Sequence, residues 1–127
     1  MTRYDVTLQC KEKAFLLFKK EIESKYYNDY FKPDRILKSN NNVYTIIWDN
    51  IGWAWTYYEV ALIKEIMDKL DEDDYFENGE YAYKYICIGE EESDVEIREN
   101  GAAIEELEDF YIIRTVNLPK KYEELEI

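Results

Sequence analysis

The spacing of apolar residues switches between a period of two and a period near four, and this limits the folds that the chain can adopt. Tyr4, Val6, Leu8 and Cys10 alternate with polar residues, which is typical of a half-buried β-strand. From residue 11 the apolar residues fall three and four apart, which predicts an amphipathic helix over residues 11–27.

The same two periods recur along the rest of the chain. Apolar runs at residues 35–37 and 43–48 flank a Ser-Asn-Asn-Asn turn and predict a β-hairpin, whose second strand should break at residues 49–52. A second helix is expected over residues 56–70. Further segments show strand-like alternation at residues 80–88, 95–98 and 110–118. Residues 102–107 fit a helical turn or a strand, and residues 120–127 fit a tail or a docked final turn.

The order of these elements predicts the fold class. A β-α-β-β-α-β order with added short elements is typical of an α+β fold, with two helices on one face of an antiparallel sheet. We expect a ferredoxin-like core followed by C-terminal strands. With 127 residues and no linker or repeat, residues 1–127 should form a single acidic domain. We found no apolar run of membrane-spanning length and no signal-peptide pattern, so we expect a cytoplasmic protein.

The charge of the chain is large and unevenly distributed. Twenty-nine acidic residues oppose sixteen basic ones, for a net charge of −13. Residues 1–64 carry ten basic and eight acidic residues, whereas residues 65–127 carry six basic and twenty-one acidic ones. Such a field repels nucleic acids and anionic membranes and attracts basic surfaces. We therefore expect a basic protein partner, and no direct binding to nucleic acid or membrane.

Residues that commonly carry catalysis are scarce. The chain has no histidine, its three serines lie outside any nucleophile motif, and its two cysteines, Cys10 and Cys87, are expected to be buried thiols. An EF-hand alignment on Gly79 puts Phe76 and Tyr85 at ligand positions, which excludes a calcium loop. We expect no enzymatic activity and no cofactor. A carboxylate-dependent metal enzyme is the minor alternative, since paired carboxylates can bind catalytic metals.

Three acidic groups lie close together in the sequence and are expected to lie close in space. Carboxylates on a small rigid surface can imitate a run of phosphates, and an aromatic ring among them would supply an anchor. The alternative is that they are ordinary solvated loops and helix ends. The predicted partner-binding residues, from the first two groups, are Asp68, Asp71, Glu72, Asp73, Asp74, Tyr75, Glu77, Glu90, Glu91, Glu92, Asp94 and Glu96. The third group is Glu105, Glu106, Glu108 and Asp109.

As a whole, this short, acidic, tyrosine-rich chain without histidine resembles small phage-encoded inhibitors of host defence, of the anti-CRISPR and anti-restriction types. Residues 83–96 are similar to segments of phage proteins of Gram-positive hosts. The resemblance implies an inhibitor that acts in the host cytoplasm. It also implies that the acidic surface occupies the nucleic-acid site of a nuclease, as a nucleic-acid mimic.

An immunity protein or antitoxin that neutralises a basic nuclease toxin is the alternative of a different class. Such proteins bind tightly with electrostatic steering. An aromatic interface would then lie at the entry to the second helix, formed by Trp53, Trp55, Tyr57 and Tyr58. Packing of these rings under the sheet is the favoured interpretation.

Overall fold

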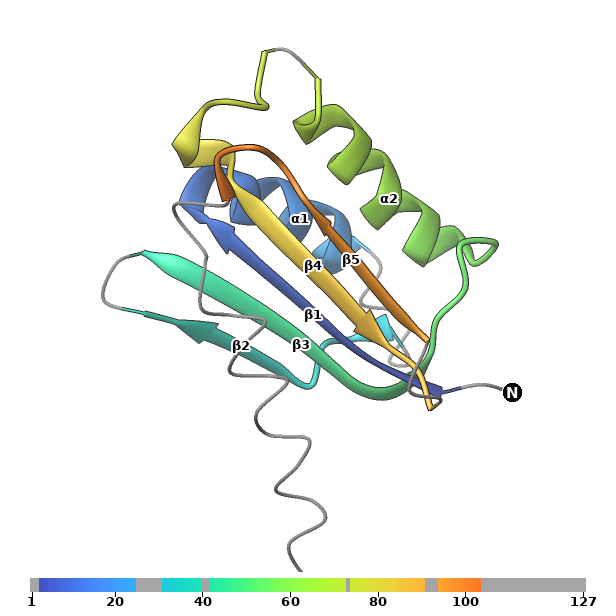
Figure 1. Cartoon of the computed structure of the whole chain (residues 1–127). Coiled ribbons are helices and arrows are strands. Elements are labelled where there is room, and N and C mark those ends of the chain that lie inside the picture. The colour runs from blue at the N-terminus through green and yellow to red at the C-terminus, as the bar shows by residue number, and fades with distance from the viewer. Residues whose placement is uncertain (1–2, 25–30, 40–41, 73, 91–93, 104–127) are drawn as a thin grey trace, which may run out of the picture.

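The computed structural model describes residues 3–24, 31–39, 42–72, 74–90 and 94–103, which form one sheet with two helices (Figure 1). The sheet is antiparallel, and its five strands follow the order β2-β3-β1-β4-β5. In chain order the elements are β1 (Arg3–Lys11), α1 (Glu12–Ser24), β2 (Arg35–Lys38), β3 (Val43–Gly52), α2 (Tyr58–Leu70), a 3₁₀-helix (Gly79–Tyr81), β4 (Tyr83–Ile88) and β5 (Val95–Glu99).

Both helices cover the same face of the sheet (Figure 1). This confirms the predicted α+β class with two helices on one face. Helix α1 connects β1 to β2 across β3, and α2 connects β3 to β4 across β1, so the first four strands are two interleaved β-α-β units. Strand β5 then pairs with β4 at the edge. A ferredoxin-like relationship itself stays a prediction.

The core between helices and sheet explains the apolar spacing. Alternate residues of the central strands face the helices, and every third or fourth residue of each helix faces the sheet. The indole N–H of Trp48 is hydrogen-bonded inside this core, since Nε1 donates to the backbone carbonyl of Phe31 at 2.7 Å. The buried helical residues are Ala14, Phe15, Phe18 and Ile22 of α1 and Val60, Ile63, Met67 and Leu70 of α2.

Two predicted strand boundaries were wrong. Strand β4 begins at Tyr83 and not at residue 80, because Asn78 accepts a hydrogen bond from the Glu80 N–H and starts a 3₁₀-helix. Strand β3 does not break after Trp48 but continues to Gly52. Asn50 takes a left-handed backbone conformation (φ 52°) at a bulge in β3, where Asp49 and Asn50 lie opposite Asp5 of β1, and the Asn50 N–H donates to the Asp5 carboxylate.

Several other boundaries agree closely with the expected ones. Helix α2 begins at Tyr58, two residues later than expected, after an extended Tyr57.

None of the helices in the described ranges is long and apolar enough to cross a membrane. The strand predicted over residues 110–118, the open segment beyond residue 103 and the tail at 120–127 lie outside the described residues.

Candidate partner-binding surface

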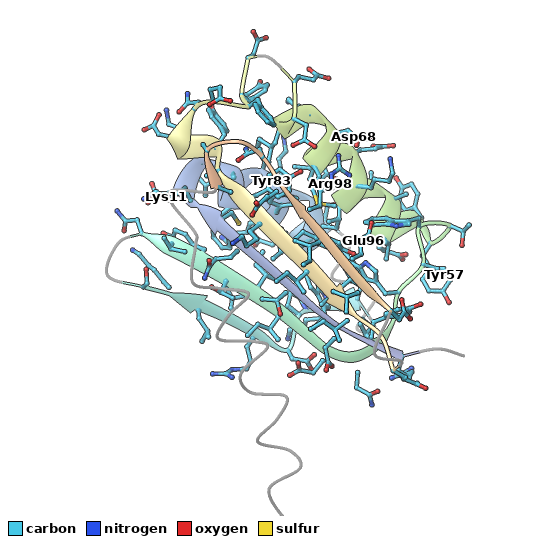
Figure 2. The ribbon with its side chains drawn as sticks, viewed as in Figure 1. Lys11, Tyr57, Asp68, Tyr83, Glu96 and Arg98 are labelled. Carbon is cyan, nitrogen blue, oxygen red and sulfur yellow. The ribbon has the colours of Figure 1, made fainter. Side chains whose placement is uncertain are left out.

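The predicted acidic residues lie along the side of the molecule formed by α2 and β5. Figure 2 shows Asp68 on α2, with Arg98 and Glu96 along the neighbouring strand. The predicted residues that the structure describes are Asp68, Asp71, Glu72, Asp74, Tyr75, Glu77, Glu90, Asp94 and Glu96. Asp73, Glu91 and Glu92 lie outside the described residues, as does the third acidic group, Glu105, Glu106, Glu108 and Asp109.

The first two acidic groups lie at opposite ends of β4. Asp71 accepts a hydrogen bond from the hydroxyl of Tyr83, at the start of the strand, whereas Glu90 follows its end. Strand β4 contains six residues, so five steps of ~3.3 Å separate its ends, about 17 Å. The structure therefore arranges these carboxylates as a band and does not gather them into one cluster.

Arg98 binds two of the predicted partner-binding carboxylates. Its Nη2 lies 2.5 Å from Asp68 Oδ1 and 2.9 Å from Asp71 Oδ2, and its Nε donates to Asp71 Oδ2 at 3.3 Å. The Tyr83 hydroxyl donates to the other Asp71 oxygen at 2.8 Å. Asp68 and Asp71 thus link the C-terminal end of α2 to β5 and β4. Because these contacts occupy their carboxylate oxygens, the two residues are less available to a partner than the exposed carboxylates are.

The charge states in this network follow from these contacts. The hydrogen bond from Arg98 lowers the pKa of Asp68, against the smaller opposing effect of burial. Burial alone would lower the pKa of Arg98, but its hydrogen bonds to Asp68 and Asp71 raise it overall. Burial, and then the bond to Asp71, raises the pKa of Tyr83. At neutral pH the network holds a cation, an ionised Asp68 and a neutral phenol donor.

Sequence reasoning missed Arg98, although a signal was present. Residues of a strand alternate between faces, and Arg98 pairs with Tyr85 while Glu96 pairs with Cys87. Arg98 is therefore on the helix side of an edge strand, next to the acidic end of α2. A single cation on the inward face of an acidic strand predicts an ion pair with the neighbouring element.

The loop after α2 presents exposed carboxylates on a frame of turns. Glu72, Asp74 and Glu77 are exposed. The Glu72 carbonyl accepts from the N–H groups of Tyr75 and Phe76, each at 2.9 Å. The Tyr75 ring packs edge-on against Tyr81, with centroids 4.8 Å apart, and lies below the Lys69 ammonium. Tyr75 is half-buried, so only part of its ring is available to a partner.

The turn between β4 and β5 is tied to the start of β1. The Gly89 N–H donates to the Asp94 carbonyl at 2.7 Å, and the Arg3 N–H donates to the Glu90 carboxylate at 3.1 Å. The Asp94 side chain lies so close to Gly89 that a Cβ there would clash with it. Partial loss of water contact, and then the Asp94 carboxylate, raise the pKa of Tyr4. Glu96, on β5, is exposed.

The aromatic residues at the entry to α2 belong mostly to the core. Trp53 is buried, and its Nε1 donates to the Tyr85 hydroxyl at 2.9 Å. Trp55 packs against the same ring, with centroids 5.8 Å apart. Tyr58, by contrast, is 62% exposed. The aromatic interface considered for an immunity protein is thus reduced largely to Tyr58, since Trp53 packs as the favoured interpretation expected.

The nucleophilic and metal-binding side chains are not assembled into a site in the described part of the chain. No three cysteine, aspartate or glutamate side chains there form a group that could hold a metal ion. Both thiols are buried, and burial raises the pKa of Cys87 to about 12 and that of Cys10 further. Because the thiolate is the reactive form, neither thiol is activated in this fold.

Sheet order converts the charge asymmetry of the sequence into an asymmetry in space. Strands β2, β3 and β1 lie on one side and β4 and β5 on the other. The described residues up to 52 carry eight basic and six acidic residues, whereas those from 53 to 103 carry four basic and twelve acidic ones. The α2–β5 side is therefore the acidic side of the molecule.

No protein-family model, curated protein or solved structure matches the chain.

Proposed function

We propose that the chain is an acidic binding protein that inhibits a nucleic-acid-binding enzyme, of the anti-CRISPR or anti-restriction type. Its α2–β5 side would occupy the basic nucleic-acid site of that enzyme, as a nucleic-acid mimic. One observation carries the proposal: the described residues from 53 to 103 hold twelve acidic and four basic residues on one side of the sheet. Such a surface attracts basic grooves over long range.

The geometry favours particular carboxylates for this role. Asp68 and Asp71 are engaged by Arg98, so the exposed groups at the two ends of β4 are the better contacts. Glu72, Asp74 and Glu77 lie at one end, and Glu90 follows the other. The length of β4 between these two ends, about 17 Å, corresponds to roughly five phosphates along one strand of duplex DNA. A rigid sheet holds the two ends at this fixed spacing.

Recovery of the partner is the first test. Tagged chain is mixed with lysate containing candidate defence nucleases, eluted with a salt gradient and analysed by mass spectrometry. We expect a nucleic-acid enzyme that elutes at moderate salt and is displaced by added DNA or guide RNA, because exposed charges are screened within ~10 Å at 0.1 M salt. A partner indifferent to both salt and nucleic acid would contradict the mimic. A basic nuclease toxin would favour the immunity protein.

Charge reversal then locates the surface. The double variant Glu72→Lys and Asp74→Lys should weaken binding to the recovered enzyme on the order of tenfold or more, mainly through slower association. Glu12→Lys with Glu23→Lys is the matched control, since these exposed α1 residues give the same change in net charge. Asp71 is left intact because its loss would disturb the fold. Equal weakening by both doubles would mean that net charge, and not this surface, governs binding.

A further inference from the structure

Strand β2 forms the edge of the sheet that is farthest from β5, and among the described strands it pairs with β3 alone (Figure 1). All four residues of the strand, Arg35–Lys38, are exposed. An edge strand presents backbone N–H and C=O groups on its outer side, and these groups can pair with a strand of another protein. Strand β2 therefore has the backbone chemistry of a strand-addition site.

The ladder between β2 and β3 identifies the backbone groups that point outward. The Ser39 N–H donates to the Val43 carbonyl at 2.9 Å, so these two residues form a hydrogen-bonded pair. In an antiparallel ladder such pairs alternate with non-bonded ones. Leu37 is therefore in a bonded pair with β3, whereas Ile36 and Lys38, on either side of it, are in non-bonded pairs. The N–H and C=O groups of Ile36 and Lys38 point away from β3.

Exposed apolar side chains stand on both faces of this edge. Ile36 pairs with Ile46, which is completely buried in the core under the helices, so Ile36 lies on the helix side of the sheet. Leu37, the next residue, lies on the opposite face. Ile36 is 43% exposed and Leu37 is 42% exposed. A strand that paired with this edge would cover part of both side chains, and burial of apolar surface contributes about 25 cal/mol per Å².

Basic side chains flank the two apolar ones. Arg35 and Lys38 are the ends of β2, and the exposed Lys32 comes shortly before the strand. The neighbouring carboxylate of Asp34 already accepts a hydrogen bond from the Asp49 N–H, at 2.7 Å. This edge is thus locally positive on a chain whose net charge is −13. Since opposite charges on paired strands attract, the edge favours a strand that carries carboxylates.

A second copy of β2 is a poor match for this edge. Antiparallel pairing of two copies about Leu37 would bring Arg35 and Lys38 of both molecules into the same short stretch, and like charges on paired strands repel. Each copy also has a net charge of −13, which opposes association of the two molecules. Charge therefore favours an acidic segment over a second β2.

We propose that β2 binds an extended acidic segment of another protein by strand addition, through the outward backbone groups of Ile36 and Lys38. Carboxylates of that segment pair with Arg35 and Lys38, and its apolar side chains cover Ile36 and Leu37. The acidic surface lies at the other edge of the sheet, with β5. This second site is therefore separate from the acidic surface and does not depend on its partner.

Amide NMR of the full-length chain with a synthetic peptide tests the site. The probe is a short peptide that alternates valine and glutamate, and its control has lysine in place of glutamate. We expect the glutamate peptide, at millimolar concentration, to shift the amide resonances of Ile36 and Lys38 and to slow their hydrogen exchange, because outward N–H groups gain an acceptor. No binding, equal binding of the two peptides, or shifts confined to other parts of the chain would overturn the proposal.

Charge reversal on β2 tests the electrostatic part. The double variant Arg35→Glu and Lys38→Glu should weaken binding of the glutamate peptide on the order of tenfold, because two exposed ion pairs are replaced by repulsion. The matched control is Lys19→Glu with Lys20→Glu, which makes the same change in net charge at exposed positions of α1. We expect this control to bind like the unmodified chain. Equal weakening by both doubles would contradict a site on β2.

A methylated peptide tests the backbone hydrogen bonds without any change to the protein. Methylation of all backbone nitrogens of the glutamate peptide keeps its carboxylates but removes its backbone donors, so we expect binding to weaken on the order of tenfold. Unchanged affinity would overturn strand addition. Resonances of Ile36 and Lys38 that shift with the concentration of the chain alone would assign this edge to a second copy, and they would overturn the proposal as well.

Discussion

At the scale of single residues, Arg98 organises the acidic side of the molecule. Its planar guanidinium offers several donors in a fixed geometry, so one side chain from β5 can bind both Asp68 of α2 and Asp71, the residue that caps the C-terminus of α2. Tyr83, on β4, donates a hydrogen bond to the other carboxylate oxygen of Asp71. The cation therefore joins β5 to the C-terminal end of α2, where carboxylates would otherwise repel each other, and the Tyr83–Asp71 hydrogen bond adds β4.

Acid should weaken this link. The pKa of Asp68 is lowered in the fold, so its contribution to stability is complete above the unfolded value of ~3.9 and is lost as pH falls through the lower folded value. Asp68→Asn should lower the free energy of unfolding at pH 7 by about 1 kcal/mol or less, because the side chain is half-exposed. The difference should shrink as pH falls below the unfolded value and through the lower folded one.

Urea unfolding across this pH range measures the effect, and Asp74→Asn is the matched control, since Asp74 is exposed in the loop after α2. We expect the control to unfold like the unmodified chain at every pH. A deficit of Asp68→Asn that is constant with pH would show that the ion pair with Arg98 is not its cause.

At the scale of elements, the hairpin between β2 and β3 depends on one backbone conformation. Asn42 has a positive φ of 58°. Its N–H donates to the Ser39 carbonyl at 3.2 Å, and the Ser39 N–H donates to the Val43 carbonyl at 2.9 Å. Glycine and asparagine accept this left-handed region, whereas β-branched residues do not. The turn therefore sets the register that places β2 on the sheet.

Substitutions at Asn42 should separate backbone strain from loss of the side chain. Asn42→Gly should leave the free energy of unfolding within about 0.5 kcal/mol. Asn42→Val should lower it by roughly 1–2 kcal/mol, because a Cβ-branched side chain clashes in the left-handed region. Chemical denaturation measures both, with Lys38→Val on β2 as a control for the added valine. Equal effects of glycine and valine would mean that the amide side chain matters more than φ.

At the scale of the whole molecule, charge is segregated across the sheet. The acidic side contains α2, β4 and β5, and the opposite edge is β2, with Arg35 and Lys38. A net charge of −13 on 127 residues produces repulsion within the compact state. The excess negative charge that would attract a basic partner therefore also lowers the stability of the free protein.

Added salt should therefore stabilise the free chain. Raising NaCl from 0.01 to 0.15 M shortens the screening length from ~30 to ~8 Å, and we expect the free energy of unfolding to rise on the order of 1 kcal/mol. Urea unfolding at the two concentrations measures this. A variant with Glu72→Gln and Asp74→Asn should show a smaller rise. Stability that falls with salt would mean that pairs such as Arg98–Asp68 outweigh the repulsion.

Element types followed from the sequence more reliably than element ends. The change of apolar period identified β1, both helices and the strands β3, β4 and β5, because one buried face imposes one period. The ends at residues 49–52 and 80–82 were wrong. At these ends the left-handed Asn50 and the capping Asn78 decide the local conformation. A single polar residue does not change the apolar period from which the ends were predicted.

By itself the sequence determined the α+β class, the absence of histidine and the acidity of the second half of the chain, since these depend on composition and local period. Only the tertiary structure decided which carboxylates are engaged. Asp71 meets Tyr83 and Arg98, 12 and 27 residues away, through the register of β4 and β5 and their packing against α2. These contacts join residues that are far apart in the sequence, and a local sequence pattern does not predict which distant residues meet.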